Sequence, residues 1–143
     1  MKHPNDFKKI AKAMTVKHYF GRIVELPFET TEQRLRESLQ AEGFGILTEV
    51  DVRQTLKKKI DVDFYPYKIL GACNPRLAHQ VLAEDPTMGV FLPCGVVIRA
   101  IDERTTEVLV MNPEAMHHYS TGNGVASAAT EVKQRLENAL AAL

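Results

Sequence analysis

The sequence lacks a surplus of charge of either sign and is poor in aromatic side chains. Its eighteen basic and eighteen acidic residues give a formal net charge of zero, whereas proteins dedicated to nucleic acid or to anionic membranes are strongly basic. Only six Phe and four Tyr are available to stack on bases. The composition therefore predicts no nucleic-acid partner and no membrane partner.

Cysteines and long apolar runs are scarce as well. Two cysteines in 143 residues exclude a disulfide framework, and this cysteine content predicts the reducing cytoplasm as the compartment. No apolar run approaches the roughly 20 residues that span a bilayer. The first 18 residues contain five lysines and no apolar stretch of the kind found in secretory signals.

The composition is that of an ordinary soluble globular domain, with 45% hydrophobic and 25% charged residues. Its length fits one domain with a core, which we place at residues 19–143. Residues 1–18 are predicted to be a basic amphipathic extension. Its apolar residues have the spacing of one helix face, with Asp6 as the cap: Phe7, Ile10, Ala11 and Met14. We expect this helix to pack on the edge of the domain, with a partner contact as the alternative.

The first part of the domain contains one helix with clear start and end signals. A strand over residues 19–26 precedes it. Thr30 and Gln33 have the spacing of a capping box and predict the start of the helix. The helix is expected to continue through Glu42, since Gly43 then occupies the left-handed position of a Schellman ending.

Further strands are indicated by β-branched residues and alternation. In the first of them Ile46, Thr48 and Val50 fall on one side, and Glu49 and Asp51 on the other. The predicted strands cover residues 46–52, 67–73, 90–101 and 107–111.

Two more helices complete the prediction. Asn74 followed by Pro75 is a strong helix start, and the last helix carries an apolar face from Val125 to Leu143. The order predicts an α+β fold, a curved antiparallel sheet with helices packed on one face. Its elements follow the order β-α-β4-α with short helical inserts.

The two cysteines are the first candidates for a functional site. Lys68 and Arg99 are expected to point to solvent, which places Cys73 and Cys94 inward at the same end of the sheet. Two close thiols can form a redox couple or supply two metal ligands, whereas a buried cysteine can also be a small hydrophobe. Asn74 begins a helix whose dipole favours a thiolate at Cys73. Cys73, Asn74 and Cys94 are therefore candidate ligand-binding residues.

Two other patterns carry possible chemistry. Glu49 and Asp51 lie on one face of a strand, where paired carboxylates can exchange protons or bind a hard cation. The alternative is that Asp51 caps the next helical turn and Glu49 is simply exposed. Gly122-Asn123-Gly124 precedes the last helix and can either present N–H groups to an anion or give the chain a flexible entry.

Several runs resemble the DUF302 family, a family of undefined function. The runs lie at residues 45–52, 55–57, 67–75 (YKILGACNP) and 92–94 (LPC), and the resemblance extends from about Tyr19 to the C-terminus. It implies a TBP-like α+β fold and cysteines at the positions of Cys73 and Cys94 as part of the family pattern. The family typically has Asn after the second cysteine, where this chain has Gly95.

Three functions remain open at this point. The first is a module that binds a small ligand or a metal near the cysteine pair. The second is an interaction or structural subunit that forms a homodimer through a sheet edge or the basic helix. The third is a thiol-dependent redox or sulfur-transfer enzyme with Cys73 as nucleophile. The sequence contains no cofactor fingerprint, so it predicts no particular cofactor.

Overall fold

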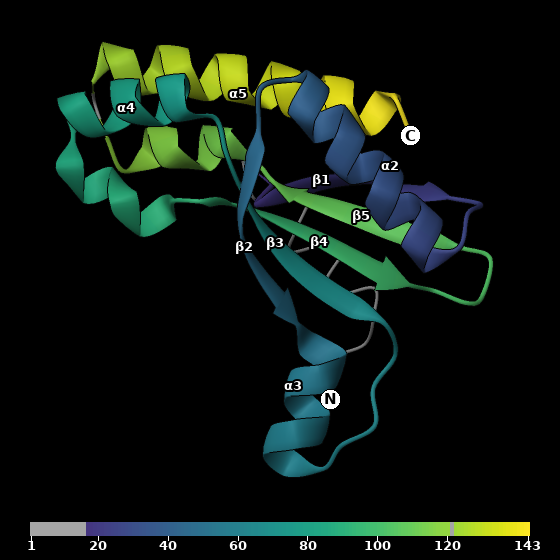
Figure 1. Cartoon of the computed structure of the whole chain (residues 1–143). Coiled ribbons are helices and arrows are strands. Elements are labelled where there is room, and N and C mark those ends of the chain that lie inside the picture. Colours follow the sequence, from purple (N-terminus) through teal and green to yellow (C-terminus); the bar gives the residue numbers. More distant parts are fainter. Residues whose placement is uncertain (1–16, 121) are drawn as a thin grey trace.

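The structure is a computed structural model that describes residues 17–120 and 122–143. Five strands form one antiparallel sheet with the spatial order β1-β5-β4-β3-β2 (Figure 1). The predicted α+β class and element order are confirmed. The predicted helix within residues 1–18 lies outside the described residues. The strands are β1 (Tyr19–Val24), β2 (Gly45–Asp51), β3 (Tyr67–Cys73), β4 (Cys94–Ala100) and β5 (Thr106–Met111).

Three helices cover one face of this sheet, and a fourth projects from its end. Helices α2, α4 and α5 pack together and contribute to a single core with β4 and β5. Among the described elements, helix α3 has its main contacts with β2 and β3, and it extends beyond the sheet (Figure 1). The helices are α2 (Phe28–Ala41), α3 (Val52–Ile60), α4 (Pro75–Glu84) and α5 (Asn123–Ala141), with 3-10 turns η1 (Pro86–Phe91) and η2 (Pro113–His118).

Strand register divides the sheet into two faces. Residues paired across neighbouring strands point to the same side, and the buried ones, such as Val96, Ile98, Val108 and Val110, define the covered face. Alternate residues form the other side, which we call the open face because none of the described helices packs on it. The open face comprises Tyr19, Gly21, Ile23, Gly45, Thr48, Val50, Tyr67, Ile69, Gly71, Cys73, Gly95, Val97, Arg99, Glu107, Leu109 and Met111.

The end of helix α2 agrees with the prediction, but its start does not. Gly43 has φ +86°, and the N–H groups of Gly43 and Phe44 donate to the carbonyls of Gln40 and Leu39, which completes a Schellman ending. The predicted capping box at Thr30 is wrong, because the helix begins at Phe28. Phe28 is buried in the core, and its burial draws the first turn of the helix two residues upstream.

Two strand predictions also required correction. A bulge between Ile46 and Thr48 in β2 breaks the predicted alternation, so Ile46 lies on the covered face while Thr48 and Val50 lie on the open face. Strand β4 begins at Cys94 rather than at residue 90, because residues 86–91 form a 3-10 turn and Pro93 follows it.

The last helix closes the core, as its apolar face predicted. Seven side chains of α5 are buried, including Val125, Val132, Leu136 and Leu140. Arg22 of β1 donates from Nη1 to the Leu140 carbonyl oxygen at 2.9 Å, where a cation meets the negative end of the helix. Across the part of the chain that the structure describes, we find no helix with the length and apolar character needed to cross a membrane.

Candidate functional site

The two cysteines lie at the same end of the sheet, but on opposite faces. Cys94 pairs with Ala72 and is buried on the covered face, whereas Cys73 pairs with Gly45 on the open face and is half-buried. Both thiols are free. The predicted shared inward orientation is therefore wrong and no disulfide joins the two residues, although both line the same small cavity at this end of the sheet.

The error arose at Lys68, which we expected to point to solvent. Lys68 instead pairs with Ile98 on the covered face, where its side chain is 23% exposed. Its Nζ lies 3.0 Å from a Glu32 carboxylate oxygen and 2.9 Å from one of Glu49. Two carboxylates thus stabilise a lysine at the rim of the core, so its charge did not indicate the direction of its side chain.

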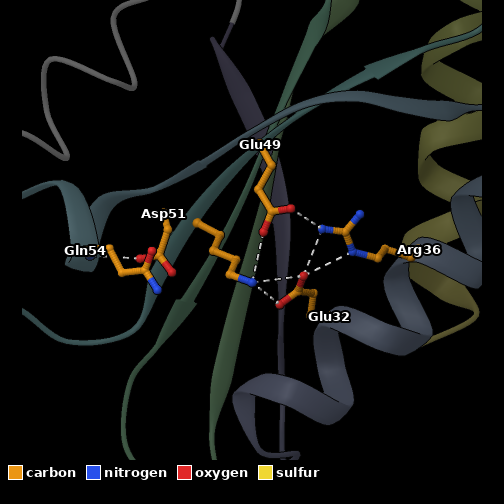
Figure 2. A network of polar contacts seen from close by, with 6 residues as sticks. Glu32, Arg36, Glu49, Asp51 and Gln54 are labelled. Atoms are coloured by element: carbon orange, nitrogen blue, oxygen red, sulfur yellow. Dashed lines mark hydrogen bonds and ion pairs between the residues drawn. The ribbon is translucent and has the colours of Figure 1, made fainter.

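Glu49 belongs to this ion network rather than to an acidic pair (Figure 2). Arg36 of α2 donates to Glu32 at 2.9 Å and to Glu49 at 3.0 Å, which joins α2 to β2. The hydrogen bond from Lys68 is the largest cause that lowers the pKa of Glu49. Two acids and two bases balance each other, so the network leaves no net charge for a cation. We interpret it as a structural clamp.

The two remaining predicted site residues are helix caps. The Asp51 carboxylate accepts from the Gln54 N–H at 3.0 Å and begins α3, as one alternative predicted. The Asn74 side chain accepts from the Leu77 N–H at 3.4 Å and begins α4. These two hydrogen bonds give both side chains a structural role as helix caps. Whether either residue also contacts a ligand stays a prediction.

The space beside Cys94 is too small for a small-molecule ligand. A cavity of about 20 Å³ lies between Cys94, Leu77, Val81 and Met116, a volume that accommodates about one water molecule. Burial, together with a smaller effect of the neighbouring Cys73, raises the pKa of the Cys94 thiol to about 11. A neutral thiol in an apolar pocket behaves as a small hydrophobe.

The anion predicted at the start of α5 is supplied by the protein itself. The Glu84 carboxylate accepts from the Val125 N–H at 2.7 Å, although the two residues are 41 positions apart. A Cβ added at Gly122 or Gly124 would collide with Glu84, so both glycines make room for this carboxylate. The Gly122-Asn123-Gly124 run therefore holds an internal carboxylate against a helix N-terminus.

An apolar row crosses all five strands on the open face, and the sequence analysis did not identify it. Successive register partners are Gly21, Leu109, Val97, Ile69 and Val50. Ile69 is 39% exposed and Val50 45%. The alternation within each strand determines which of its residues belong to this row. Its continuity depends on the register between strands, which one sequence does not reveal.

The open face is hollowed at its β1–β5–β4 side. The hollow has a volume of about 680 Å³. Val97, Leu109 and Met111 line it together with Gly95, where an added Cβ would meet nothing within 4 Å. The missing side chain at Gly95 therefore gives the hollow part of its depth.

Polar groups border this hollow. Arg99 Nε lies 2.6 Å from the Glu107 carboxylate in the neighbouring strand, and both residues line the hollow. His18 and Tyr19 lie at the start of β1, and Tyr19 is 43% exposed. An apolar floor with polar groups at its border is the arrangement of a ligand site. A second hollow, of about 690 Å³, lies near the other end of β1 and β5, but charged residues such as Glu25 and Asp102 line it.

A family model described as "Domain of unknown function DUF302" matches residues 20–143. The chain belongs to the DUF302 family. The match covers every described strand except the first residue of β1, so the resemblance identified from the sequence runs is confirmed. No curated protein matches the chain.

The shared fold of this DUF302 domain is also seen in a crystal structure. The structure, described as an uncharacterized conserved protein DUF302 from Bacillus stearothermophilus, is 31% identical and superposes with a TM-score of 0.79. The match covers 89% of this chain and 98% of that one. Within residues 17–120 and 122–143, no three His, Cys, Asp or Glu residues are grouped so that they could hold a metal ion.

Proposed function

We propose that this DUF302 domain is a binding module that holds a small, mainly apolar molecule in the hollow of its open face. The observation that carries the proposal is the apolar row across five strands. Monomeric soluble proteins seldom expose a continuous apolar surface unless it contacts something. Val97 and Leu109 lie at the centre of this row and also line the hollow.

The border of the hollow indicates the chemistry of the ligand. Arg99 uses its Nε for Glu107, and a guanidinium carries five N–H donors. Its other N–H groups can therefore donate to an acidic or carbonyl oxygen at one end of the ligand. The body of the ligand would contact Val97 and Leu109, while Tyr19 supplies an aromatic wall. We expect an apolar body with one oxygen-bearing end.

This proposal moves the binding site predicted near the cysteines. The cavity beside Cys94 accommodates about one water molecule, whereas the hollow is more than thirty times larger. Cys73 lies on the open face but does not line the hollow, so the proposed site contains neither of the two predicted thiols. The thiol-enzyme hypothesis gains no comparable support, because the residues that line the Cys94 cavity include no acid or histidine to act as a base.

Filling the hollow tests the proposal. The probe is 1-anilinonaphthalene-8-sulfonate, which combines aromatic rings with an anionic group, and binding is followed by methyl NMR of the full chain. The probe should shift the Val97 and Leu109 methyl resonances. Gly95→Leu inserts a side chain where the structure has open space. It should weaken binding about tenfold, which corresponds to about 1.4 kcal/mol.

Gly45→Leu is the matched control. Gly45 is also a strand glycine whose added Cβ would meet nothing within 4 Å, but it does not line the hollow. It lies opposite Cys73, so a ligand bound beside that thiol would be displaced by Gly45→Leu instead. Equal affinity in the wild type and Gly95→Leu, or shifts confined to methyl groups outside the open face, would contradict the proposal.

A further inference from the structure

We propose that residues 1–16 dock their apolar side on the open face of the same chain and compete there with the ligand. The docking goes beyond the proposed function and holds without it, whereas the competition rests on that function. The occupant of the open face is thus this chain's own N-terminal segment. The argument uses the point at which the segment joins the sheet, the spacing of its apolar residues, and its charge.

The segment joins the sheet beside the hollow. The Asn112 side chain donates to the Lys17 carbonyl at 3.0 Å, and the Asn112 N–H donates to the His18 carbonyl at 2.9 Å. Asn112 itself is buried. These bonds fix the chain immediately before β1, and His18 already lines the hollow. Residues 1–16 therefore start from the border of the surface that we propose they cover.

The segment has the length and the pattern that this surface requires. Its apolar residues Phe7, Ile10, Ala11 and Met14 have the spacing of a single helix face. A helix over residues 6–16 would be about 16 Å long, and five strands measure about 19 Å across. One helix face can therefore follow most of the apolar row from Gly21 to Val50.

The charges of the two parts are complementary. Four of the eighteen basic residues and one of the eighteen acidic residues precede residue 17, so the segment has a net charge of +3. The remaining residues hold fourteen basic and seventeen acidic side chains, a net charge of −3. Glu107 lies on the open face, where it is paired with Arg99, and the hollow near the other end of β1 is lined by Glu25, Asp102 and Glu103 with one base, Arg104. Lysines beside the apolar face would meet this net acidic end of the sheet.

The segment is additional to the domain shared with the family. The family match begins at residue 20, and the Bacillus stearothermophilus protein is covered over 98% of its chain while 11% of this chain lies outside the match. The open face is built by the shared strands alone. An additional segment that covers it would give this chain control over a surface built from the shared strands.

Methyl NMR of the full chain tests the docking without any ligand. We expect nuclear Overhauser effects between the methyl groups of Ile10 or Met14 and those of Val97 or Leu109. In the double variant Ile10→Lys/Met14→Lys these effects should vanish and the open-face methyl resonances should shift. Resonances of Val96 and Val108 on the covered face should stay in place, which shows that the domain is folded.

Val16→Lys is the control, because residue 16 falls on the opposite side of the helical pattern; it should leave the open-face resonances unchanged.

A mixture of differently labelled chains identifies whether the docked segment belongs to the same chain or to a second copy. Effects between chains would replace our proposal by docking of a second copy, and absent effects would overturn it. The double variant should also bind 1-anilinonaphthalene-8-sulfonate several-fold more tightly than the wild type.

The two proposals can fail separately. One outcome is that nuclear Overhauser effects connect the N-terminal segment to the open face while the probe binds neither the wild type nor the double variant. This would contradict the ligand site and leave the docking intact. Probe binding that Gly95→Leu weakens, without any docking effects, would contradict the docking and leave the ligand site intact. Equal probe affinity in the wild type and the double variant would contradict the competition.

Discussion

The Cys94 thiol shows how burial of a single residue links protonation to stability. Its pKa in the folded chain is about 11, raised by burial and then by Cys73, whereas an unperturbed thiol has a pKa of about 8.5. The folded state therefore favours the neutral thiol. This contribution is complete below about pH 8.5 and is lost as the pH rises toward 11.

Cys94→Ala should consequently have a pH-dependent cost. At pH 7 we expect the free energy of unfolding to fall by about 1–2 kcal/mol, since a buried sulfur is removed. At pH 10 the difference from the wild type should shrink by roughly 1–2 kcal/mol, because only the wild type must keep a thiol neutral. Urea unfolding at both pH values measures this. Val96→Ala also truncates a buried side chain but removes no titrating group, so its difference in unfolding free energy from the wild type should be the same at both pH values. A pH-independent difference for Cys94→Ala would contradict the raised pKa of Cys94.

Two paired glycines on the open face should respond oppositely to the same added methyl group. Gly71 and Gly95 are register partners. A Cβ at Gly71 would lie 2.6 Å from Pro93 Cγ and would collide with Thr48 Oγ1, while a Cβ at Gly95 would meet nothing within 4 Å. Gly71→Ala should cost about 2 kcal/mol or more, and Gly95→Ala should be neutral or slightly stabilising. Thermal unfolding of both variants decides this, and similar costs would contradict it.

At the scale of elements, the Glu84 carboxylate and Gly124 should be energetically coupled. Glu84→Ala removes the cap of α5 and should cost about 1 kcal/mol. Gly124→Ala should also destabilise the wild type, because its Cβ would collide with Glu84. In the Glu84→Ala background the same substitution should instead stabilise by roughly 0.5–1 kcal/mol, since Ala favours helix over Gly.

A double-mutant cycle on the free energy of unfolding measures that coupling. Additive effects would show that Glu84 does not hold the start of α5. The control is Ala126→Gly, two residues further along α5, whose cost should be the same in both backgrounds.

Local signals predicted most elements, and tertiary contacts explain the exceptions. Asn74 with Pro75, and Gly43 after α2, use hydrogen bonds within a few residues, so the sequence displays them. Glu84 caps a helix 41 positions away, and no local pattern indicates that contact. Lys68 misled the assignment of faces for a similar reason, because its two carboxylate partners come from α2 and β2. The predicted shared orientation of the two cysteines failed with that assignment.

At the scale of the whole molecule, stability should be unevenly distributed. None of the nine residues Val52–Ile60 of α3, all of which the structure describes, is buried, whereas α5 buries seven side chains. The main contacts of α3 within the described part of the chain are with β2 and β3, beyond the main core (Figure 1). Its backbone amides should therefore exchange with deuterium well before those of α5, through local opening. Mass spectrometry of exchanged peptides measures this, and equal protection of the two helices would contradict it.

The open face itself could not be predicted from the sequence as a surface. Each strand supplies one or two of its apolar residues, and alternation places them on the side away from the helices. Their union into a row follows from the order β1-β5-β4-β3-β2, which joins residue 21 to residue 109. That pairing joins distant parts of the chain, which leave no local trace.

This strand order also governs how the protein can form on a ribosome. Of the described strands β1 is synthesised first, and the strand it pairs with among them is β5, about 90 residues later. The three strands β2, β3 and β4 can pair in order as they emerge, but β1 must wait until most of the chain exists. The face that they share is only partly covered by α2 and α4 until α5 has left the exit tunnel. Completion of the fold therefore waits for α5, and a chain stalled before residue 123 presents apolar surface to chaperones.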